Sequence, residues 1–411
     1  MKLKRFVSVI PSNFVVKDGS LHIDEDFANN MQIYLEYFEE VTILSNLSNA
    51  QGNGMLAATR PFAQMNGHER VRLQVLPFPY REDKYYLHRN RMRNLFLKSL
   101  ETASVLHITP HAPLDWPTLS ARCAFAARVP YVIQADWDLW STSKQIYSQL
   151  RNPIKRTRKR ILVQRFLAHY ADVLDGAAVA LLHGSDVFTA NEHRTPNPRL
   201  IHNPSITKAD HIDDEALSAK KARVPEQGPL RIIYAGRLED MKGPIEWLRT
   251  LRSLKQAGLS FDARWFGWGT LEDKFKEQVT ALGLHDAVTL HKNVPRDVLL
   301  EEVRHSDIFL FCHKLRESPR NLIEALACGT PIIGFESPYA LDLVAEHGGG
   351  RYAAVGDTNG LAAAVLALDA DRGALADLVQ SAARSGSMFS REDAMKERIE
   401  LMMEHATIRK T

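Results

Sequence analysis

The chain alternates short apolar runs with stretches of helical spacing, and this alternation constrains the fold more than any other feature. Successive parallel strands need a crossover, usually a helix, so the order predicts parallel βαβ units. The near-continuous apolar character of the runs favours a sheet covered on both faces. In the first half the runs are Arg5–Ile10, Val41–Ser45, Val71–Leu76, Val105–Thr109, Pro130–Gln134 and Gly176–Leu182.

A break over residues 195–229 separates this block from a second one. Its segments TPNPRLIHNPS and VPEQGPL are dense in Pro, Asn and Gly, which is typical of a linker or hinge. The alternation then restarts at Leu230–Ala235. We therefore predict an α/β chain of two Rossmann-like domains, residues 1–205 and 206–389, which agrees with a length of 411 residues. Ligands of such sheets bind outside the carboxyl ends of the strands.

Composition excludes several classes of protein. The apolar fraction of 45% and the charged fraction of 25% are those of a soluble globular protein, not of a disordered or collagen-like chain. No apolar run approaches the ~18–20 residues that span a bilayer, and the run Phe6–Ile10 is too short for a signal-peptide core. The three cysteines include no CxxC pair, so a disulfide framework is not expected and the cytoplasm is the expected location.

The segment Glu317–Gly334 (ESPRNLIEALACGTPIIG) carries the strongest indication of a binding site. A helix is predicted to begin near Pro319–Asn321, and the free N–H groups and dipole of a helix start favour a phosphate. Glu324 lies one turn into that helix, where its carboxylate can accept two hydrogen bonds from a ribose diol. The alternative is a surface glutamate on a packed helix. Cys328 is expected in the core.

The segment Tyr234–Gly243 (YAGRLEDMKG) gives a second indication. Gly236 ends a predicted strand and lets the backbone approach a ligand closely. Arg237 and Lys242 follow on the loop, and cations at the carboxyl end of a strand suit a diphosphate. The alternative is a pair of solvated loop cations.

Four motifs, taken in order, resemble those of the GT-B retaining glycosyltransferases of family 4. They are GRL-x3-KG (236–243), FGWG (266–269), ALGLHDAVTLH (281–291) and the Glu-rich segment 317–334. The resemblance covers roughly residues 230–355 well and the first half loosely. It implies a GT-B fold, with two Rossmann-like domains facing across an interdomain cleft and a helix at about 390–409 that packs back on the first domain.

The resemblance also implies roles for individual residues. Arg237 and Lys242 would bind the donor diphosphate, Glu324 the nucleotide ribose, and Glu317 would be a catalytic residue near the donor sugar. The full set implied for donor binding is Gly236, Arg237, Lys242, Gly267, Arg320, Asn321, Leu322 and Glu324.

One departure concerns the two glutamates of the motif. The resembled family places seven residues between them, whereas Glu317 and Glu324 enclose six. Either Glu317 fills the first motif position, as the coherent ESPRNLIEAL pattern favours, or Arg316 does. The neighbouring cations Lys314 and Arg320 form a basic cluster with Arg316 that can also meet phosphate. The glycine-rich loop common after the first strand is replaced by a loop over Pro11–Leu21, with a turn expected at Asp18–Gly19.

Loops at strand ends of the first half supply the acceptor-side candidates. Asp136 lies where the resembled family often carries an acceptor-side His or Asp, so it is the second catalytic candidate. In such retaining enzymes the donor phosphate itself helps to accept the acceptor's proton. Trp137 and Trp140 have faces that suit sugar rings, with packing as the alternative. The acceptor-side residues named from these loops are His111, Trp137 and Asp138.

No metal or cofactor is expected. There is no DxD-type motif, and the pair His107 and His111 lies on a Pro-containing segment, not on a helix with metal-ligand spacing. The resemblance likewise implies metal independence, with the nucleotide-diphospho-sugar as substrate. A nicotinamide-dependent dehydrogenase is disfavoured because no GxGxxG follows the first strand.

Charge is split between the halves. Residues 1–205 carry 25 Lys and Arg against 18 Asp and Glu, a net +7, which leaves −4 for the rest of a chain whose total is +3. Two basic stretches, within Tyr80–Leu100 and Arg151–Arg165, account for the excess. A basic amphipathic helix over 151–166 fits an anionic membrane surface, and the alternative is a solvated helix face. Nucleic acid is not an expected partner, since no binding motif accompanies the charge.

Together these features predict a retaining glycosyltransferase that transfers a sugar from a nucleotide-diphospho-sugar to a glycan or lipid-linked acceptor, in cell-surface polysaccharide or glycolipid synthesis. It would be cytoplasmic, and peripheral on the inner face of the membrane if the basic helix binds there. Two alternatives stay open. One is a GT-B sugar-nucleotide epimerase or hydrolase, and the other is a catalytically silent GT-B partner subunit.

Overall fold

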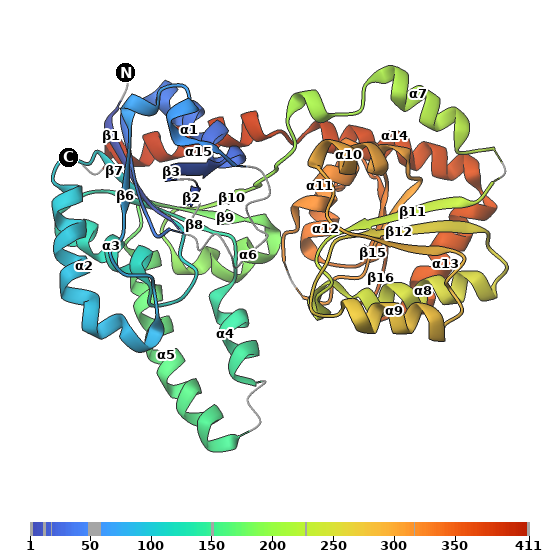
Figure 1. The fold of residues 1–411 in the computed structure, drawn as a ribbon, viewed down its shortest axis with the longest axis horizontal. Helices are drawn as coiled ribbons and strands as arrows, with labels where there is room; N and C mark the ends of the chain where they lie inside the picture. The colour runs from blue at the N-terminus through green and yellow to red at the C-terminus, as the bar shows by residue number, and fades with distance from the viewer. Residues whose placement is uncertain are drawn as a thin grey trace. The chain divides into compact units, whose positions relative to one another are not determined.

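The computed structural model describes residues 3–10, 14–17, 19–47, 59–148, 152–226, 228–315 and 317–408. The chain forms two units (Figure 1). Unit 1 comprises Met1–Ile201 and Met395–Thr411, and unit 2 comprises His202–Ala394. The boundary thus lies four residues before the one expected at 205/206.

Unit 1 is built on a seven-stranded parallel sheet in the order β10-β9-β8-β7-β1-β4-β6. The strand order reverses between β1 and β7, which is the switch point of a doubly wound sheet. The strands predicted in this half are all present. Their bounds are β1 Leu3–Val9, β4 Phe38–Ser45, β6 Val71–Val75, β7 Val105–Ile108, β8 Tyr131–Ala135, β9 Val179–His183 and β10 Pro198–Ile201.

Both faces of this sheet are covered, as the apolar strands predict. Side chains of β1 alternate between two cores: Val7 and Val9 pack in one, and Phe6 packs in the other. The first core takes buried residues from α2 (Tyr85–Leu100), α3 (Trp116–Ala126) and α5 (Pro153–Asp175). The second takes them from α1 (Glu25–Tyr37) and α15 (Arg391–Ile408). Two further helices are α4 Leu139–Ser148 and α6 Gly184–Asn191.

Two segments expected to be irregular contain regular structure. In Pro11–Leu21, β2 (Phe14–Lys17) pairs antiparallel with β3 (Ser20–Asp24), which also pairs with β5 (Thr59–Pro61). The loop prediction was wrong for Phe14–Lys17 because Phe14 and Val15 are buried, as is Ile23 opposite Phe14. Asp18 of the predicted turn lies outside the described residues. In the predicted linker, Pro198 begins β10, and a proline is tolerated there because β10 is an edge strand. The same segment contains α7 (Asp214–Arg223).

Unit 2 is a six-stranded parallel sheet in the order β13-β12-β11-β14-β15-β16, again with a switch point, here between β11 and β14. The strands predicted from its apolar runs are confirmed, and β16 is additional; the predicted ranges are Leu230–Ala235, Asp262–Phe266, Val288–His291, Ile308–Phe311 and Pro331–Gly334. The bounds are β11 Leu230–Ala235, β12 Phe261–Phe266, β13 Val288–His291, β14 Ile308–Phe311, β15 Ile332–Phe335 and β16 Gly350–Ala353.

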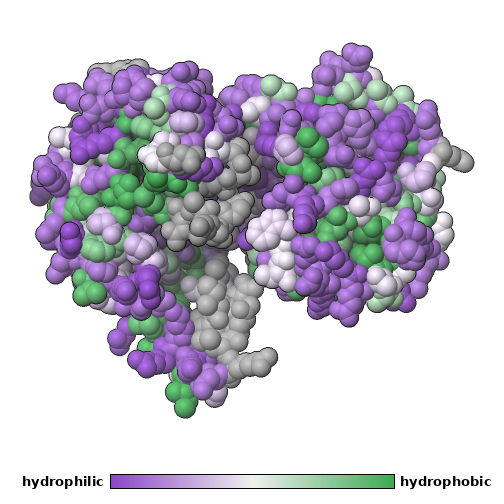
Figure 2. Space-filling view, viewed as in Figure 1, coloured by the Kyte–Doolittle hydropathy of each residue, from purple (hydrophilic) through white to green (hydrophobic). Residues whose placement is uncertain are grey.

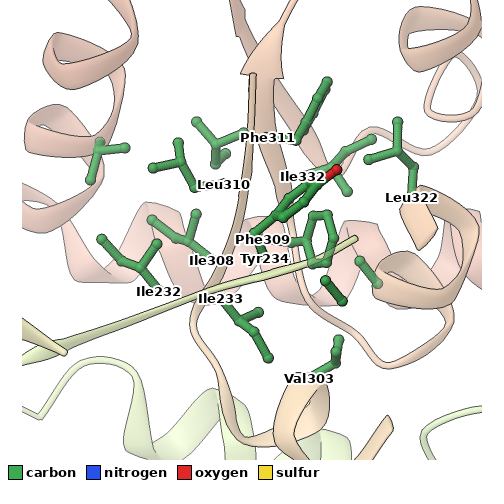
Figure 3. Close-up of a cluster of buried hydrophobic side chains, with 14 of the residues drawn as sticks. Ile232, Ile233, Tyr234, Val303, Ile308, Phe309, Leu310, Phe311, Leu322 and Ile332 are labelled. Carbon is green, nitrogen blue, oxygen red and sulfur yellow. The ribbon is translucent and has the colours of Figure 1, made fainter. Parts of the chain in front are cut away.

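The core of unit 2 is formed where β11 and β14 meet the helices (Figure 3). Ile232, Ile233 and Tyr234 of β11 lie beside Ile308–Phe311 of β14 and Leu322. This packing fixes the two strand ends at the switch point. The helices are α8 Pro244–Gln256, α9 Glu272–Ala281, α10 Arg296–His305, α11 Arg320–Ala327, α12 Pro338–Asp342, α13 Thr358–Ala370 and α14 Arg372–Ser387.

Candidate functional site

The donor-side candidates gather at the carboxyl ends of the unit 2 strands. Gly236 and Arg237 directly follow β11, Gly267 follows β12, and Glu317 lies in the loop after β14. Because these strands are parallel neighbours, their carboxyl ends share one edge of the sheet. In open α/β sheets this edge, beside the switch point, is where ligands bind.

Lys242 is held at this edge by the backbone around it. It ends a short 3-10 turn, Asp240–Lys242, and Gly243 follows with a φ of 66°. A Cβ on Gly243 would lie 2.0 Å from the Cys312 carbonyl oxygen, so only glycine permits this approach of the β11 loop to the end of β14. The loop therefore fixes the backbone position from which the Lys242 side chain extends.

Lys242 and Glu317 form an ion pair. The Lys242 Nζ lies 2.6 Å from the Glu317 Oε1, and the two side chains are only 11% and 14% exposed. The pair joins the loop after β11 to the loop after β14, so it bridges the two sides of the switch point. A cation so placed can meet a diphosphate, and a carboxylate beside it can accept hydrogen bonds from sugar hydroxyls.

A buried His–Tyr pair lies next to this ion pair, and none of the sequence motifs predicted it. The Tyr234 hydroxyl lies 2.7 Å from the His313 Nε2, while the His313 Nδ1 is 3.8 Å from the Glu317 Oε1. Burial and the nearby Lys242 ammonium hold the pKa of His313 well below its usual value, so this imidazole is neutral. Burial and the Glu317 carboxylate raise the pKa of Tyr234. His313 lies just after β14, and its place at a strand's carboxyl end could have identified it.

Gly236 and Gly267 bring two loops into backbone contact. Gly267 has a φ of 144°, and a Cβ there would lie 2.1 Å from the Gly236 carbonyl oxygen. The Gly236 N–H donates to the Phe266 carbonyl at 2.9 Å. Arg237 is exposed, and its guanidinium makes no hydrogen bond or ion pair within the described part of the chain. It is therefore a cation available at the same edge.

The start of α11 supplies the remaining donor-side residues. Asn321 donates from Nδ2 to the Ala235 carbonyl at 2.6 Å and so ties α11 to the end of β11. Arg320 is exposed, whereas Leu322 is 1% exposed and packs in the core, leaving its backbone as the part that a ligand can reach. Glu324 accepts a hydrogen bond of 2.5 Å from the Ser205 hydroxyl.

The surroundings of Ser205 were not predicted. Arg296 of α10 donates to the Ser205 carbonyl at 3.0 Å and to the Asp210 carboxylate at 3.0 Å. Nothing in the spacing of the motifs points to Ser205, because it lies in the predicted linker. The Ser205 hydroxyl donates a hydrogen bond to one oxygen of the Glu324 carboxylate.

Of the basic cluster beside Glu317, Lys314 is engaged elsewhere. The Lys314 Nζ lies 2.6 Å from the Asp240 carboxylate and 3.4 Å from the Glu246 carboxylate. The backbone N–H of Lys314 donates to the Met241 carbonyl. Lys314 thereby anchors the loop that carries Lys242. Arg316, the alternative for the first motif position, lies outside the described residues.

On the acceptor side, buried polar groups of unit 1 lie on neighbouring strands near Asp136. Ser8 on β1 lies 3.0 Å from the His107 Nδ1 on β7, and Gln134 on β8 donates to the Asp136 Oδ1 at 3.2 Å. The His107 Nε2 is buried and has no hydrogen-bond partner within the described residues. Burial, with Arg398 of α15 nearby, lowers the pKa of His107 to about 3, so this histidine is neutral.

The other acceptor-side candidates differ in how they are used. Both carboxylate oxygens of Asp138 accept N–H groups of α4, from Trp140 and Ser141, so Asp138 caps that helix. Trp137 is 43% exposed. His111 is exposed, and its Nδ1 lies 3.1 Å from the Thr109 carbonyl. Trp140 is stacked under the Arg194 guanidinium at 4.1 Å, which makes it a packing residue at the rim of a groove on α5.

Within the described residues, no helix has the length and apolarity that crossing a membrane requires. The same residues contain no cluster of three or more His, Cys, Asp or Glu side chains arranged to hold a metal ion.

Two doubly wound parallel sheets, with an ion pair at the switch point of the second, define the class of the chain: it has the GT-B fold. Solved GT-B structures share it over nearly the whole length. HepE of Anabaena, solved with UDP, superposes with a TM-score of 0.69 at 15% identity, covering 98% of this chain and 100% of HepE. WaaG, a glycosyltransferase involved in lipopolysaccharide biosynthesis, gives 0.63 at 13% identity, covering 97% and 99%.

The second unit also resembles a known family. Residues 217–385 match the model of the glycosyl transferases group 1. Two curated relatives are similar in sequence. The amylovoran biosynthesis glycosyltransferase AmsK of Erwinia amylovora is 27% identical over 262 residues, which are 56% of this chain and 64% of AmsK.

The second relative is the putative colanic acid biosynthesis glycosyltransferase WcaL of Escherichia coli K12. It is 27% identical over 180 residues, which are 42% of this chain and 44% of WcaL. The chain therefore spans less than two thirds of the length of each of these relatives.

Proposed function

We propose that this chain is a retaining glycosyltransferase of family 4 that transfers a sugar from a nucleotide-diphospho-sugar to a glycan or lipid-linked acceptor. The observation that carries the proposal is the Lys242–Glu317 ion pair at the switch point of a unit that matches the group 1 glycosyltransferase model. It places a nearly buried cation and a carboxylate side by side where such a sheet binds its ligand.

In this proposal the donor lies across the carboxyl edge of unit 2. Gly236 and Gly267 let backbone approach the diphosphate, and Lys242 and Arg237 neutralise its charge. The N-terminal turn of α11 offers N–H groups to a phosphate, and Glu324 exchanges the Ser205 hydroxyl for the ribose diol. The ribose diol thereby replaces the Ser205 hydroxyl on Glu324, and the diphosphate replaces the Glu317 carboxylate beside Lys242.

Transfer breaks the bond between the sugar's anomeric carbon and the terminal diphosphate oxygen. The two cations stabilise the charge that develops on that oxygen, without a metal ion in our proposal. The acceptor hydroxyl bonds to the anomeric carbon on the face that the diphosphate leaves, and its proton passes to the leaving phosphate, so the configuration at that carbon is retained. Asp136, which Gln134 positions by a hydrogen bond, is the acceptor-side carboxylate that assists this proton transfer.

The names of the relatives support a role in cell-surface polysaccharide or glycolipid synthesis, since AmsK and WcaL are described as glycosyltransferases of amylovoran and colanic acid biosynthesis. HepE has also been solved with UDP-glucose, which makes UDP-sugars the first donors to test. These pathways and this donor are those of the similar proteins, and we use them to choose the substrates for the experiment.

We also propose an anionic membrane surface as a partner, bound through α5 by a protein that stays in the cytoplasm. In Figure 1, α4 and α5 extend away from the rest of unit 1. Between Pro153 and Leu162 no residue of α5 is buried, and the exposed apolar residues Ile154 and Ile161 are interspersed in sequence with exposed cations. Figure 2 shows hydrophobic and hydrophilic surface side by side at the projecting end of unit 1. Apolar groups with cations around them fit the boundary of an anionic bilayer.

The test is a thermal-shift screen against UDP-, GDP- and ADP-sugars, followed by product analysis with Lys242→Ala and Glu324→Ala. A ligand that binds the folded state raises the melting temperature, so the cognate base should stand out. Both variants should keep their fold. Lys242→Ala should lose transfer by a factor of ~100 or more, as expected when one charge-stabilising donor is removed, and Glu324→Ala should lose transfer because the ribose diol loses its acceptor.

Wild-type turnover in both variants would contradict the donor-site assignment. Release of free sugar or of an epimer without an acceptor product would favour the hydrolase or epimerase alternative. Donor binding with no turnover at all would favour a silent partner subunit.

A further inference from the structure

The Glu317 carboxylate depends on one cation. Within the described residues, Lys242 is the only cation within 4 Å of this carboxylate. His313 lies at 3.8 Å but is neutral. At 14% exposure the carboxylate has little access to water. A carboxylate so enclosed is stable only while it keeps a cation or hydrogen-bond donors around it.

Donor binding takes that cation away. A diphosphate in the site draws the Lys242 ammonium toward its own oxygens, so Glu317 needs new donors. The hydroxyls of a donor sugar supply them. A nucleoside diphosphate, the product left after transfer, has no sugar hydroxyls to offer there.

The product also brings more charge. The free terminal phosphate of a nucleoside diphosphate carries about one negative charge more than the same phosphate esterified to a sugar near neutral pH. That extra charge would face an enclosed carboxylate that has just lost its counterion. The repulsion applies to the product and not to the intact donor.

We propose that Glu317 is a specificity-determining residue that makes the diphosphate site favour the sugar nucleotide over the spent nucleoside diphosphate. This inference rests on the proposed function of the site. In the empty site Glu317 neutralises Lys242, in the donor complex it accepts sugar hydroxyls, and in the product complex it repels the terminal phosphate.

The test compares binding of three matched pairs by calorimetry, without acceptor: UDP and UDP-glucose, GDP and GDP-mannose, ADP and ADP-glucose. The variant is Glu317→Gln, which keeps the shape and removes the charge. Like charges at ~4–6 Å shift an ionisation equilibrium by about 1–3 pKa units, so the variant should bind the cognate nucleoside diphosphate about tenfold or more tightly. The affinity of the Glu317→Gln variant for the sugar nucleotide should not increase in the same way.

A matched control is Asp286→Asn, which also removes a carboxylate paired with a lysine, Lys255, on the surface at the opposite edge of the unit 2 sheet. It should leave both affinities unchanged. Melting curves of both variants show whether each is folded, and Glu317→Asp should restore the preference if charge is the cause.

The two hypotheses fail differently. If wild-type protein binds the cognate pair but Glu317→Gln binds the nucleoside diphosphate no more tightly, the inference about Glu317 is overturned and the proposed function stands. If wild-type protein binds none of the six nucleotides, the proposed function is contradicted and the inference falls with it.

Discussion

Two buried lysines in unit 2 are stabilised in opposite ways. Lys242 is paired with a carboxylate at the edge of the sheet, whereas Lys220 of α7 is 5% exposed and donates to neutral oxygens, the Thr330 hydroxyl at 2.7 Å and the Cys328 carbonyl at 3.4 Å. Burial lowers the pKa of Lys220 to about 7. The first arrangement offsets the charge of the ammonium group, and the second penalises such a charge.

We predict that Lys220 makes unit 2 less stable near and below neutral pH. The unfolded chain holds the Lys220 proton up to about pH 10.5 and the folded chain releases it near 7, so the unfolded state binds more protons between these values. Stability should therefore rise with pH over this window, by at most ~1.4 kcal/mol per pH unit. Lys220→Met should remove this rise and stabilise the protein at pH 7, as measured by urea unfolding at pH 7 and 9.

The control is Lys221→Met, since Lys221 bonds to the Gln380 side chain and has no such burial. It should keep the wild-type difference between the two pH values. A Lys220→Met protein that keeps that difference would contradict the prediction.

At the same scale, the sequence identified residues that belong to spaced motifs. Lys242 and Glu317 are 75 positions apart, yet their motifs placed both at strand ends of one sheet, where the structure pairs them. Tyr234 and Ser205 belong to no motif, because their roles come from side-chain contacts that only the folded chain creates. Asp138 shows the converse, since a carboxylate at a strand end is also a good helix cap.

Elements were predictable where hydrophobic runs were long and missed where they were short or interrupted by proline. Most of the predicted strands bury the majority of their residues, and the edge strands β6 and β13, which bury one residue each, are also present. β10 begins with a proline and is partly exposed, and the small β2–β3 hairpin has only four and five residues. Such strands form because neighbours pair with them, which local sequence does not reveal.

We predict that the projecting half of α5 binds anionic vesicles. Lys155, Arg156, Arg158 and Arg160 are exposed, while Lys159 is engaged with Glu82. At ~1 kcal/mol per cation near the lipid, changing these four to Gln should reduce partitioning by at least about a hundredfold. Sedimentation with vesicles containing phosphatidylglycerol measures the loss, and added salt should weaken wild-type binding in the same direction.

A control of equal charge changes Arg249, Arg252, Lys274 and Arg384, all exposed on unit 2, to Gln. If this control loses as much vesicle binding as the α5 variant, net charge and not α5 is responsible. If neither loses any, the cations of α5 belong to a solvated helix face.

For the whole molecule, the relevant fact is that unit 1 is made from two separated parts of the chain. Met395, Ile399 and Met402 of α15 are buried in the same core as Phe6 and Tyr34, near the opposite end of the sequence. Unit 2 has its own continuous segment and its own core. Two units that share no core predict that unfolding is not a single two-state transition.

We predict that Ile399→Ala lowers the melting temperature of unit 1 alone. Removing a fully buried isoleucine side chain costs about 2–5 kcal/mol, and this one lies in the unit 1 core. Leu375→Ala, an equally buried site in unit 2, should lower the other transition. Calorimetry resolves the two, and variants that shift both transitions equally would argue for one cooperative unit.

The return of the chain to unit 1 also sets an order in time during synthesis. When Ile201 leaves the ribosome, the sheet face formed by Phe6 and its neighbours still lacks Met395 and Ile399. At ~5–20 residues per second, translating His202–Ala394 takes roughly ten to forty seconds. An apolar surface stays uncovered throughout that interval, so the unit that is begun first is completed last, and a nascent chain stalled within unit 2 presents a sticky surface to chaperones.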